Sequence, residues 1–229
     1  MARFEAGVCL NFFNVFGLEL EICTIVKHIK GSSMKITKSQ LRTLIRESVE
    51  EVLAEPKFKT PKEAYEWAIK NGPSDDSRLK ASKDPHYAYN YARAVDKRPH
   101  EVTRNGALKS QTHAHYYART VDKGPHELTR KRASEDEFEA FKYARDVDKG
   151  PHDITREAAS KSVHFAFQYA RDIEKAPHNI TRKMASKDPE YAFEYAKEID
   201  KGPHHTTYLG ASKDPIYLEK YVEEIGLPE

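Results

Sequence analysis

Cysteine is almost absent from this sequence, and long hydrophobic runs are absent too. The only two cysteines, Cys9 and Cys23, lie within residues 1–33, so the rest of the chain can use neither disulfides nor thiol chemistry. This composition suits a reducing compartment. No stretch approaches the roughly 20 apolar residues that a membrane-spanning helix needs, and the mean hydropathy is −0.79. We therefore expect neither a disulfide-stabilised secreted domain nor a membrane protein.

The motifs that mark common catalytic sites are also missing. The sequence contains no glycine-rich phosphate loop, no HExxH zinc motif and no GxSxG nucleophile motif. Neither sign of charge is in excess, since 38 Lys and Arg residues face 36 Asp and Glu residues. We expect no enzyme activity, no cofactor and no small-molecule substrate.

The dominant feature that is present is an internal repeat with a period of 26 residues. Five full copies, numbered 1 to 5 here, follow one another without insertions, with a shorter entry copy before them and a truncated exit copy after them. The seven copies span residues 57–80, 81–106, 107–132, 133–158, 159–184, 185–210 and 211–229. A fixed period of this size is typical of a solenoid, in which each unit buries its apolar face only against its neighbours. The sequence predicts an all-α solenoid of helix hairpins over residues 57–229.

Copy 5 shows how one hairpin begins. Asp188-Pro189 places a side-chain acceptor at a helix N-cap and a proline at the first helical position. Gly202-Pro203 is expected to end this first helix, with the glycine as the left-handed residue after it. Between these signals, residues recur at helical spacing and predict one buried face: Tyr191, Ala192, Tyr195, Ala196 and Ile199.

A second helix of about two turns is expected after the proline of each copy. The pattern His-x-apolar-Thr-Arg occurs there in copies 1 to 4, and we expect its apolar residue to anchor the helix on its neighbours. These anchors are Val102, Leu128, Ile154 and Ile180. In the entry copy, Gly72-Pro73 ends the first helix early, and we expect residues 74–77 to form a polar loop. The exit copy lacks the second helix.

Histidine and arginine recur in register and would form ladders along a solenoid. The candidate binding residues are His100, His126, His152, His178, Arg104, Arg130, Arg156 and Arg182. Helix layers lie roughly 8–10 Å apart and zinc–nitrogen bonds are about 2 Å long, so successive histidines cannot share one ion and we expect no metal site. The other interpretation is structural, with the histidines bonded to nearby backbone and the arginines paired across copies. We favour the structural interpretation.

A ladder of basic residues could also follow the phosphates of a nucleic acid. The net charge of the copies argues against this use. Residues 107–132 contain six basic and two acidic residues, whereas residues 133–158 contain four basic and eight acidic residues. A groove that binds nucleic acid would not become acidic in its middle copy. We therefore rank nucleic-acid association below protein binding and keep it as the alternative function.

The N-terminal segments precede the array. Residues 1–33 allow two interpretations. They are either an apolar strand pair that caps the array, or an extension upstream of the natural start, since the codons of Lys30-Gly31 can supply a ribosome-binding sequence before Met34. A signal peptide is not expected, because asparagines interrupt the apolar run and glutamates follow it.

Residues 34–56 predict an amphipathic helix that caps the first repeat, and Thr37 with Gln40 forms its capping box.

Two motifs carry a resemblance to phage proteins. The segment MKITKSQLRTLIRESVEEVL, residues 34–53, resembles the N-terminal leader of many proteins of T4-like marine phages. The DPxYAxxYAxxVxKGP pattern of residues 57–229 resembles tandem repeats in proteins of tailed phages. Such leaders can direct proteins into the prohead, where a protease cleaves after Leu-x-Glu. The resemblance therefore implies Leu53, Ala54 and Glu55 as a processing site, although 33 residues precede the leader here. The protease also accepts Ile-x-Glu, and Ile45-Arg46-Glu47 is a second match. Neither family has a defined activity.

These features predict a non-enzymatic helical-repeat scaffold or protein-binding protein, encoded by a phage and associated with its virion or with the host cytoplasm. The expected partner is another protein or further copies of the same chain. The alternative is a nucleic-acid-associated repeat protein.

Overall fold

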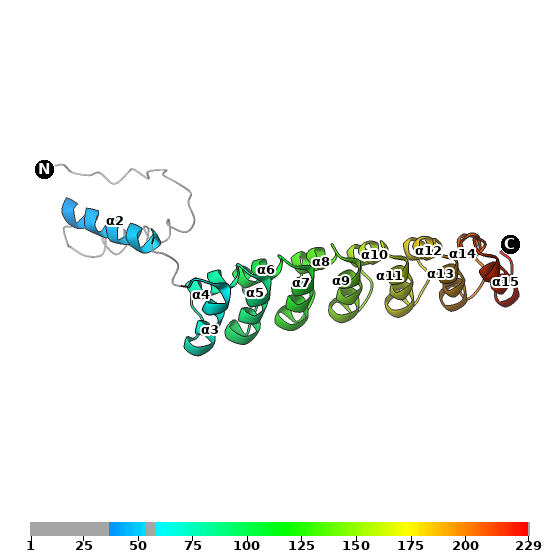
Figure 1. Cartoon of the computed structure of the whole chain (residues 1–229), viewed down its shortest axis with the longest axis horizontal. Coiled ribbons are helices and arrows are strands. Elements are labelled where there is room, and N and C mark those ends of the chain that lie inside the picture. The colour runs from blue at the N-terminus through cyan, green and yellow to red at the C-terminus, as the bar shows by residue number, and fades with distance from the viewer. Residues whose placement is uncertain (1–36, 54–57, 229) are drawn as a thin grey trace. The chain divides into compact units, whose positions relative to one another are not determined.

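The computed structural model describes residues 37–53 and 58–228 of the chain. The chain divides into two units, Met1–Glu55 and Pro56–Glu229, and each is described by itself. In the second unit, pairs of helices follow one another in a row (Figure 1), and its described residues form helices and no strands. The predicted all-α helical solenoid is therefore confirmed. Residues 1–33, with their expected strand pair, lie outside the described residues.

Helix α2 (Lys38–Leu53) is the described part of the first unit. Its predicted capping box is confirmed, because Thr37 Oγ1 accepts the Gln40 N–H at 3.3 Å and Gln40 Oε1 accepts the Thr37 N–H at 2.9 Å. Three apolar side chains of this helix are exposed, namely Leu41, Leu44 and Ile45. The capping of the first repeat by this helix stays a prediction.

Each full copy opens with a helix whose last turn is π-helical. The α-helical parts are α5 (Pro85–Tyr91), α7 (Gln111–Tyr117), α9 (Glu137–Tyr143), α11 (Val163–Gln168) and α13 (Pro189–Tyr195). The π-helical turns are η1 (Ala92–Asp96), η2 (Ala118–Asp122), η3 (Ala144–Asp148), η4 (Tyr169–Glu174) and η5 (Ala196–Asp200). The second helices, of seven residues each, are α6 (Glu101–Ala107), α8 (Glu127–Ala133), α10 (Asp153–Ala159), α12 (Asn179–Ala185) and α14 (His205–Ala211).

The first helix of copy 5 begins as predicted, but it ends differently. In copy 5, Asp188 Oδ1 accepts the Glu190 and Tyr191 N–H groups at 3.0 and 3.2 Å. At the other end, the left-handed residue is Lys201, with a φ of 54°, and not Gly202. The prediction of a left-handed glycine was therefore wrong. The sequence already indicates that a glycine is not required at this position, because Arg98 in copy 1 and Ala176 in copy 4 replace it.

The entry copy has a second helix, which corrects the predicted polar loop. Its helices are α3 (Pro61–Asn71) and α4 (Asp75–Ala81). Ser74 Oγ accepts the Ser77 N–H and Ser77 Oγ accepts the Ser74 N–H, each at 3.2 Å. These serines take the places that His100 and Thr103 hold in copy 1. A helix start capped by two serines lacks the His-x-apolar-Thr-Arg pattern, so the sequence search for that pattern missed it.

The π-helical turns distinguish the full copies from the two end copies. Helix α3 and helix α15 (Pro215–Glu224) of the exit copy have no π turn. They end at left-handed glycines, Gly72 with φ 89° and Gly226 with φ 98°, which stand in the register of Asp96. A π turn adds one residue to a helix. The full copies therefore place an acidic residue where the end copies reverse the chain.

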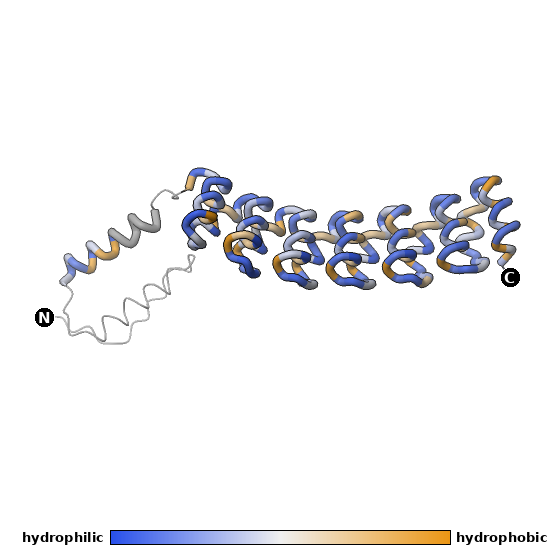
Figure 2. The backbone as a smooth tube through the Cα atoms, turned by 90° about the horizontal axis from the view of Figure 1, so that it is seen from below, coloured by the Kyte–Doolittle hydropathy of each residue, from blue (hydrophilic) through white to orange (hydrophobic). Residues whose placement is uncertain are grey.

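Alanine and tyrosine form the core, as predicted. The tyrosine row has no exposed surface and consists of Tyr91, Tyr117, Tyr143, Tyr169, Tyr195 and Tyr221. The alanines on either side of it are equally buried, including Ala140 and Ala144 beside Tyr143. Small side chains let the helices approach closely, and the large rings fill the spaces that remain. Figure 2 shows the hydropathy along the backbone, with short hydrophobic stretches alternating with hydrophilic ones along the hairpins.

The predicted anchors of the second helices are not buried. Leu128, Ile154 and Ile180 are 48%, 39% and 39% exposed. Fully buried threonines follow these residues directly, such as Thr129 after Leu128. A helix of two turns presents one face to its neighbours, and the threonine and alanine positions occupy that face. The aliphatic residue therefore lies on the outside.

Truncating the core and the exterior of one junction should have different effects. We expect Tyr143→Ala to lower the unfolding free energy by about 3–5 kcal/mol, because it opens a cavity between copies 2 and 3. Leu128→Ala removes a half-exposed side chain of copy 2 and should change it by less than about 0.5 kcal/mol. Urea unfolding monitored by circular dichroism measures both. Equal effects of the two substitutions would contradict the arrangement of the core.

Candidate functional site

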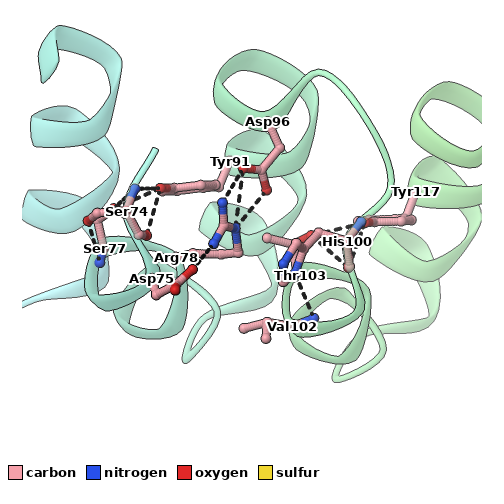
Figure 3. Close-up of polar contacts among 10 residues, drawn as sticks. All are labelled: Ser74, Asp75, Ser77, Arg78, Tyr91, Asp96, His100, Val102, Thr103 and Tyr117. Carbon is pink, nitrogen blue, oxygen red and sulfur yellow. Dashed lines mark hydrogen bonds and ion pairs between the residues drawn. The ribbon is translucent and has the colours of Figure 1, made fainter. Parts of the chain in front are cut away.

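A polar network surrounds the tyrosine hydroxyl at each junction between copies (Figure 3). The Tyr117 hydroxyl oxygen accepts the His100 N–H at 3.0 Å and lies 2.9 Å from Thr103 Oγ1. The hydroxyl also donates to the His100 carbonyl oxygen at 3.1 Å. The four following junctions repeat this network, with the same tyrosine–threonine distance at Tyr143, Tyr169, Tyr195 and Tyr221. The second helix of each copy is thus bonded to the first helix of the next.

Burial keeps the tyrosine hydroxyl in its protonated form. Burial raises the pKa of Tyr143, against the opposing effect of its hydrogen bonds from the His126 backbone and Thr129. At neutral pH the hydroxyl therefore remains a donor as well as an acceptor. In the entry copy, Ser77 Oγ lies 2.7 Å from the Tyr91 hydroxyl and replaces the threonine.

The histidine ladder caps the second helices. The Nδ1 atoms of His100, His126, His152 and His178 accept the backbone N–H two residues later, at 3.2, 3.3, 3.2 and 3.2 Å. A neutral ring that accepts at Nδ1 carries its proton on Nε2. These bonds agree with the structural interpretation of the histidines. Binding of a ligand by them stays a prediction.

The arginine ladder pairs the second helices of the entry copy and of copies 1 to 4 with the π turn of the next copy. Arg130 Nη2 lies 2.7 Å from Asp148 Oδ1, and Arg130 Nε lies 3.1 Å from Asp148 Oδ2. The side chains are mostly buried, and the hydrogen bond to Asp148 raises the pKa of Arg130 above its ordinary value. The other pairs are Arg78–Asp96, Arg104–Asp122, Arg156–Glu174 and Arg182–Asp200. Binding of a ligand by these arginines stays a prediction too.

The last junction loses both members of the pair together. Tyr208 stands in the register of the arginines, and Gly226 stands in that of the acids. The Tyr208 ring instead packs on the Tyr221 ring, with 5.7 Å between the ring centres. A buried acid without its arginine would be costly, so the joint loss agrees with a role in joining copies.

A second row of contacts between copies pairs aromatic rings. The ring of one first helix meets the ring of the next at centre distances of 5.6 to 6.3 Å, in the pairs Tyr65–Tyr87, Tyr89–His113, Phe141–Phe165, Phe167–Tyr191 and Phe193–Tyr217. The junction of copies 2 and 3 differs, because His115 and Glu139 hold these positions. The sequence analysis missed this pair. Its signal in the sequence was Glu139, an acidic residue at a position that holds a ring in the other full copies, 24 residues after His115.

His115 and Glu139 form a buried polar cluster. His115 is fully buried, and its Nδ1 lies 2.9 Å from Glu139 Oε2. Glu139 Oε1 also accepts from Thr112 Oγ1 and Lys142 Nζ, each at 3.0 Å. His115 Nε2 lies 3.6 Å from an Asp146 carboxylate oxygen and has no hydrogen bond. Burial works to raise the pKa of Glu139, but the hydrogen bonds from His115, Lys142 and Thr112 outweigh it and lower the pKa to about 2.

The described residues offer few features of other kinds of site. No three His, Cys, Asp or Glu side chains there are grouped as a metal ion needs. No helix in residues 37–53 or 58–228 is long and apolar enough to cross a membrane. A hollow of about 190 Å³ lies between copies 3 and 4, beside Lys149 and Lys175. Of the processing site, Leu53 is the last residue of α2, and Ala54 and Glu55 lie outside the described residues.

Comparison with known proteins adds no family. No family model, no curated protein and no solved structure matches the chain.

Removing an arginine of the ladder should weaken the array. Arg156→Ala leaves the buried Glu174 without its partner, so we expect the unfolding free energy to fall by about 1–3 kcal/mol. Arg171→Ala is a matched control, because Arg171 is exposed and pairs with its neighbour Asp172, a contact of about 0–1 kcal/mol. Urea midpoints measure the difference. An unchanged midpoint for Arg156→Ala would contradict the structural role.

The buried cluster predicts a pH dependence of stability. The folded-state pKa of Glu139 is about 2, below the value of about 4.3 in an unfolded chain. Its stabilising contribution is therefore present above about pH 4.3 and is lost as the pH falls toward 2. We expect the difference in unfolding free energy between wild type and Glu139→Gln to shrink over that range. The exposed Glu157→Gln is the control, and a difference for Glu139→Gln that did not change with pH would be inconsistent with this shift.

Proposed function

We propose that this chain is a non-enzymatic helical-repeat scaffold that binds another protein along the exposed side of its second helices. The observation that carries the proposal is the aliphatic row, defined as Leu128, Ile154 and Ile180. These large side chains are 39–48% exposed and stand in the same position of three successive copies. Single exposed apolar residues are common on protein surfaces, whereas apolar residues arranged together mark interaction sites.

The fold makes little use of the aliphatic row. The buried contacts of helix α8 come from Thr129 and Ala133, and the equivalent residues do the same in the other copies. The row ends where Val102 is half-buried and where Thr206 replaces the aliphatic residue. A partner that lays an amphipathic helix along copies 2 to 4 would meet it as one stripe.

The row also supports a protein partner over a nucleic acid, because aliphatic side chains offer nothing to a phosphate backbone. Nucleic-acid association remains the alternative function. The resemblance to tailed-phage proteins makes phage particles and infected cells the material in which to look for the partner.

Crosslinking in such material tests the proposal. We expect wild-type protein to crosslink to a defined protein through the second helices of copies 2 to 4. The combined variant Leu128→Ser, Ile154→Ser and Ile180→Ser should lose that crosslink while its thermal unfolding stays unchanged. The control combines Leu79→Ser with Leu209→Ser, which are 57% and 50% exposed but lie off the row.

Two outcomes would overturn the proposal. One is an equal loss of the crosslink in both variants, since the row would then have no special role. The other is recovery of nucleic acid alone, released with the steep salt dependence that phosphate contacts impose.

A further inference from the structure

Eight positions hold the same residue in all five full copies. In copy 1 they are Ala81, Ala88, Tyr91, Ala92, Lys97, Pro99, His100 and Thr103. The three alanine rows, the tyrosine row and the threonine row are fully buried. The histidines cap the second helices, and the prolines precede them in the turn. Only the lysine position is repeated without a contact that explains it.

The lysine row is defined as Lys97, Lys123, Lys149, Lys175 and Lys201. All five residues are exposed, and their ammonium groups form no hydrogen bond or ion pair with the described residues. Each has a left-handed backbone, with φ between 54° and 57°. That conformation favours glycine or asparagine over a lysine. The backbone therefore does not select the lysine, and something outside the fold is the natural partner of its charge.

The hollow between copies 3 and 4 shows what kind of group fits beside this row. Lys149 and Lys175 line it together with Arg145 and Asp172. Arg145 pairs with Asp146 and Asp172 pairs with Arg171, so the two lysines supply the positive charge that is left for a ligand. Ala144 and Ile173 contribute apolar surface to the same hollow. A carboxylate on a short aliphatic stem matches this combination, because its charge meets the ammonium groups and its methylenes meet the apolar surface.

We propose that the lysine row is the docking surface for an acidic segment of the partner protein, with Asp or Glu side chains placed against successive copies. This proposal rests on the proposed protein-binding function and names the chemistry of the partner. The row provides one cation in each full copy, so an extended acidic segment running along the array can meet several of them at once.

A peptide suits this surface better than a nucleic acid. Acidic residues follow the lysines four positions later in the first three copies, at Glu101, Glu127 and Asp153, and they are exposed. A phosphate backbone carries a charge at every nucleotide and would meet these acids as well as the lysines. A peptide can place neutral residues beside them.

Fluorescence anisotropy with a labelled peptide tests the proposal. The probe is a twelve-residue alternating Glu-Gly peptide, compared with an oligothymidylate of equal charge, at about 50 mM salt. We expect wild-type protein to bind the peptide at least tenfold more tightly than the variant Lys123→Asn, Lys149→Asn and Lys175→Asn. Asparagine removes the charge and tolerates the left-handed backbone.

The control removes three other exposed lysines, as Lys131→Gln, Lys161→Gln and Lys183→Gln. It should weaken peptide binding less than threefold. Equal weakening by the two variants would reduce the effect to net charge and overturn the proposal. Tighter binding of the oligothymidylate would assign the row to nucleic acid instead.

A different result would show that the lysines only stabilise the helix ends. Cations near a helix C-terminus interact favourably with its dipole, so the asparagine variant would then unfold at lower urea and bind the peptide unchanged. The crosslinking through the aliphatic row is independent of this outcome. If that crosslink persists while the peptide fails to bind, the proposed scaffold function is retained and only the proposed docking of an acidic segment on the lysine row is overturned.

Discussion

The buried tyrosine hydroxyl is the constraint on which the array depends. A polar group without water must find its hydrogen-bond partners inside the protein. Here they are the backbone N–H of the histidine that caps the second helix of the preceding copy and a threonine hydroxyl within that helix. The tyrosine and threonine positions are therefore fixed together, whereas the N–H is a backbone group that Ser74 supplies to Tyr91 in the entry copy. The entry copy has no preceding second helix, and the tyrosine position is Trp67, whose ring packs on Phe58 with 5.4 Å between centres.

The ion pair between copies depends on the π turn. The extra residue of the turn delays the chain reversal by one position, and the residue gained is the acid that meets the arginine of the previous copy. Where the acid is absent, at Gly72 and Gly226, the helix is regular and a left-handed glycine ends it. Because each junction uses the second helix of one copy and the first helix of the next, the copies are stable only as neighbours.

The sequence predicted the features that repeat with one clear physical cause. The period, the N-caps and the buried tyrosines followed from spacing alone. The left-handed Lys201 did not, because a glycine-proline pair is a strong termination signal and the π turn that displaces it has no simple sequence pattern. Leu128 was expected inside because it is aliphatic, whereas Thr129 occupies the interior through its hydroxyl bond to Tyr143. Hydrophobicity alone could not rank these two neighbours.

The junction of copies 2 and 3 bears on how nearly identical units keep their order. If Glu139 packed against Phe167 or Phe193 in a displaced arrangement, it would lose His115 as a donor. Lys142 of the same copy would still pair with Glu139, but the carboxylate would lose a buried hydrogen bond, which costs about 1–3 kcal/mol, against about 0.5–1.5 kcal/mol for an aromatic pair. The cluster is thus compatible with one neighbour only. Glu139 therefore opposes exchange of copies during folding, while the surrounding junctions retain interchangeable aromatic pairs.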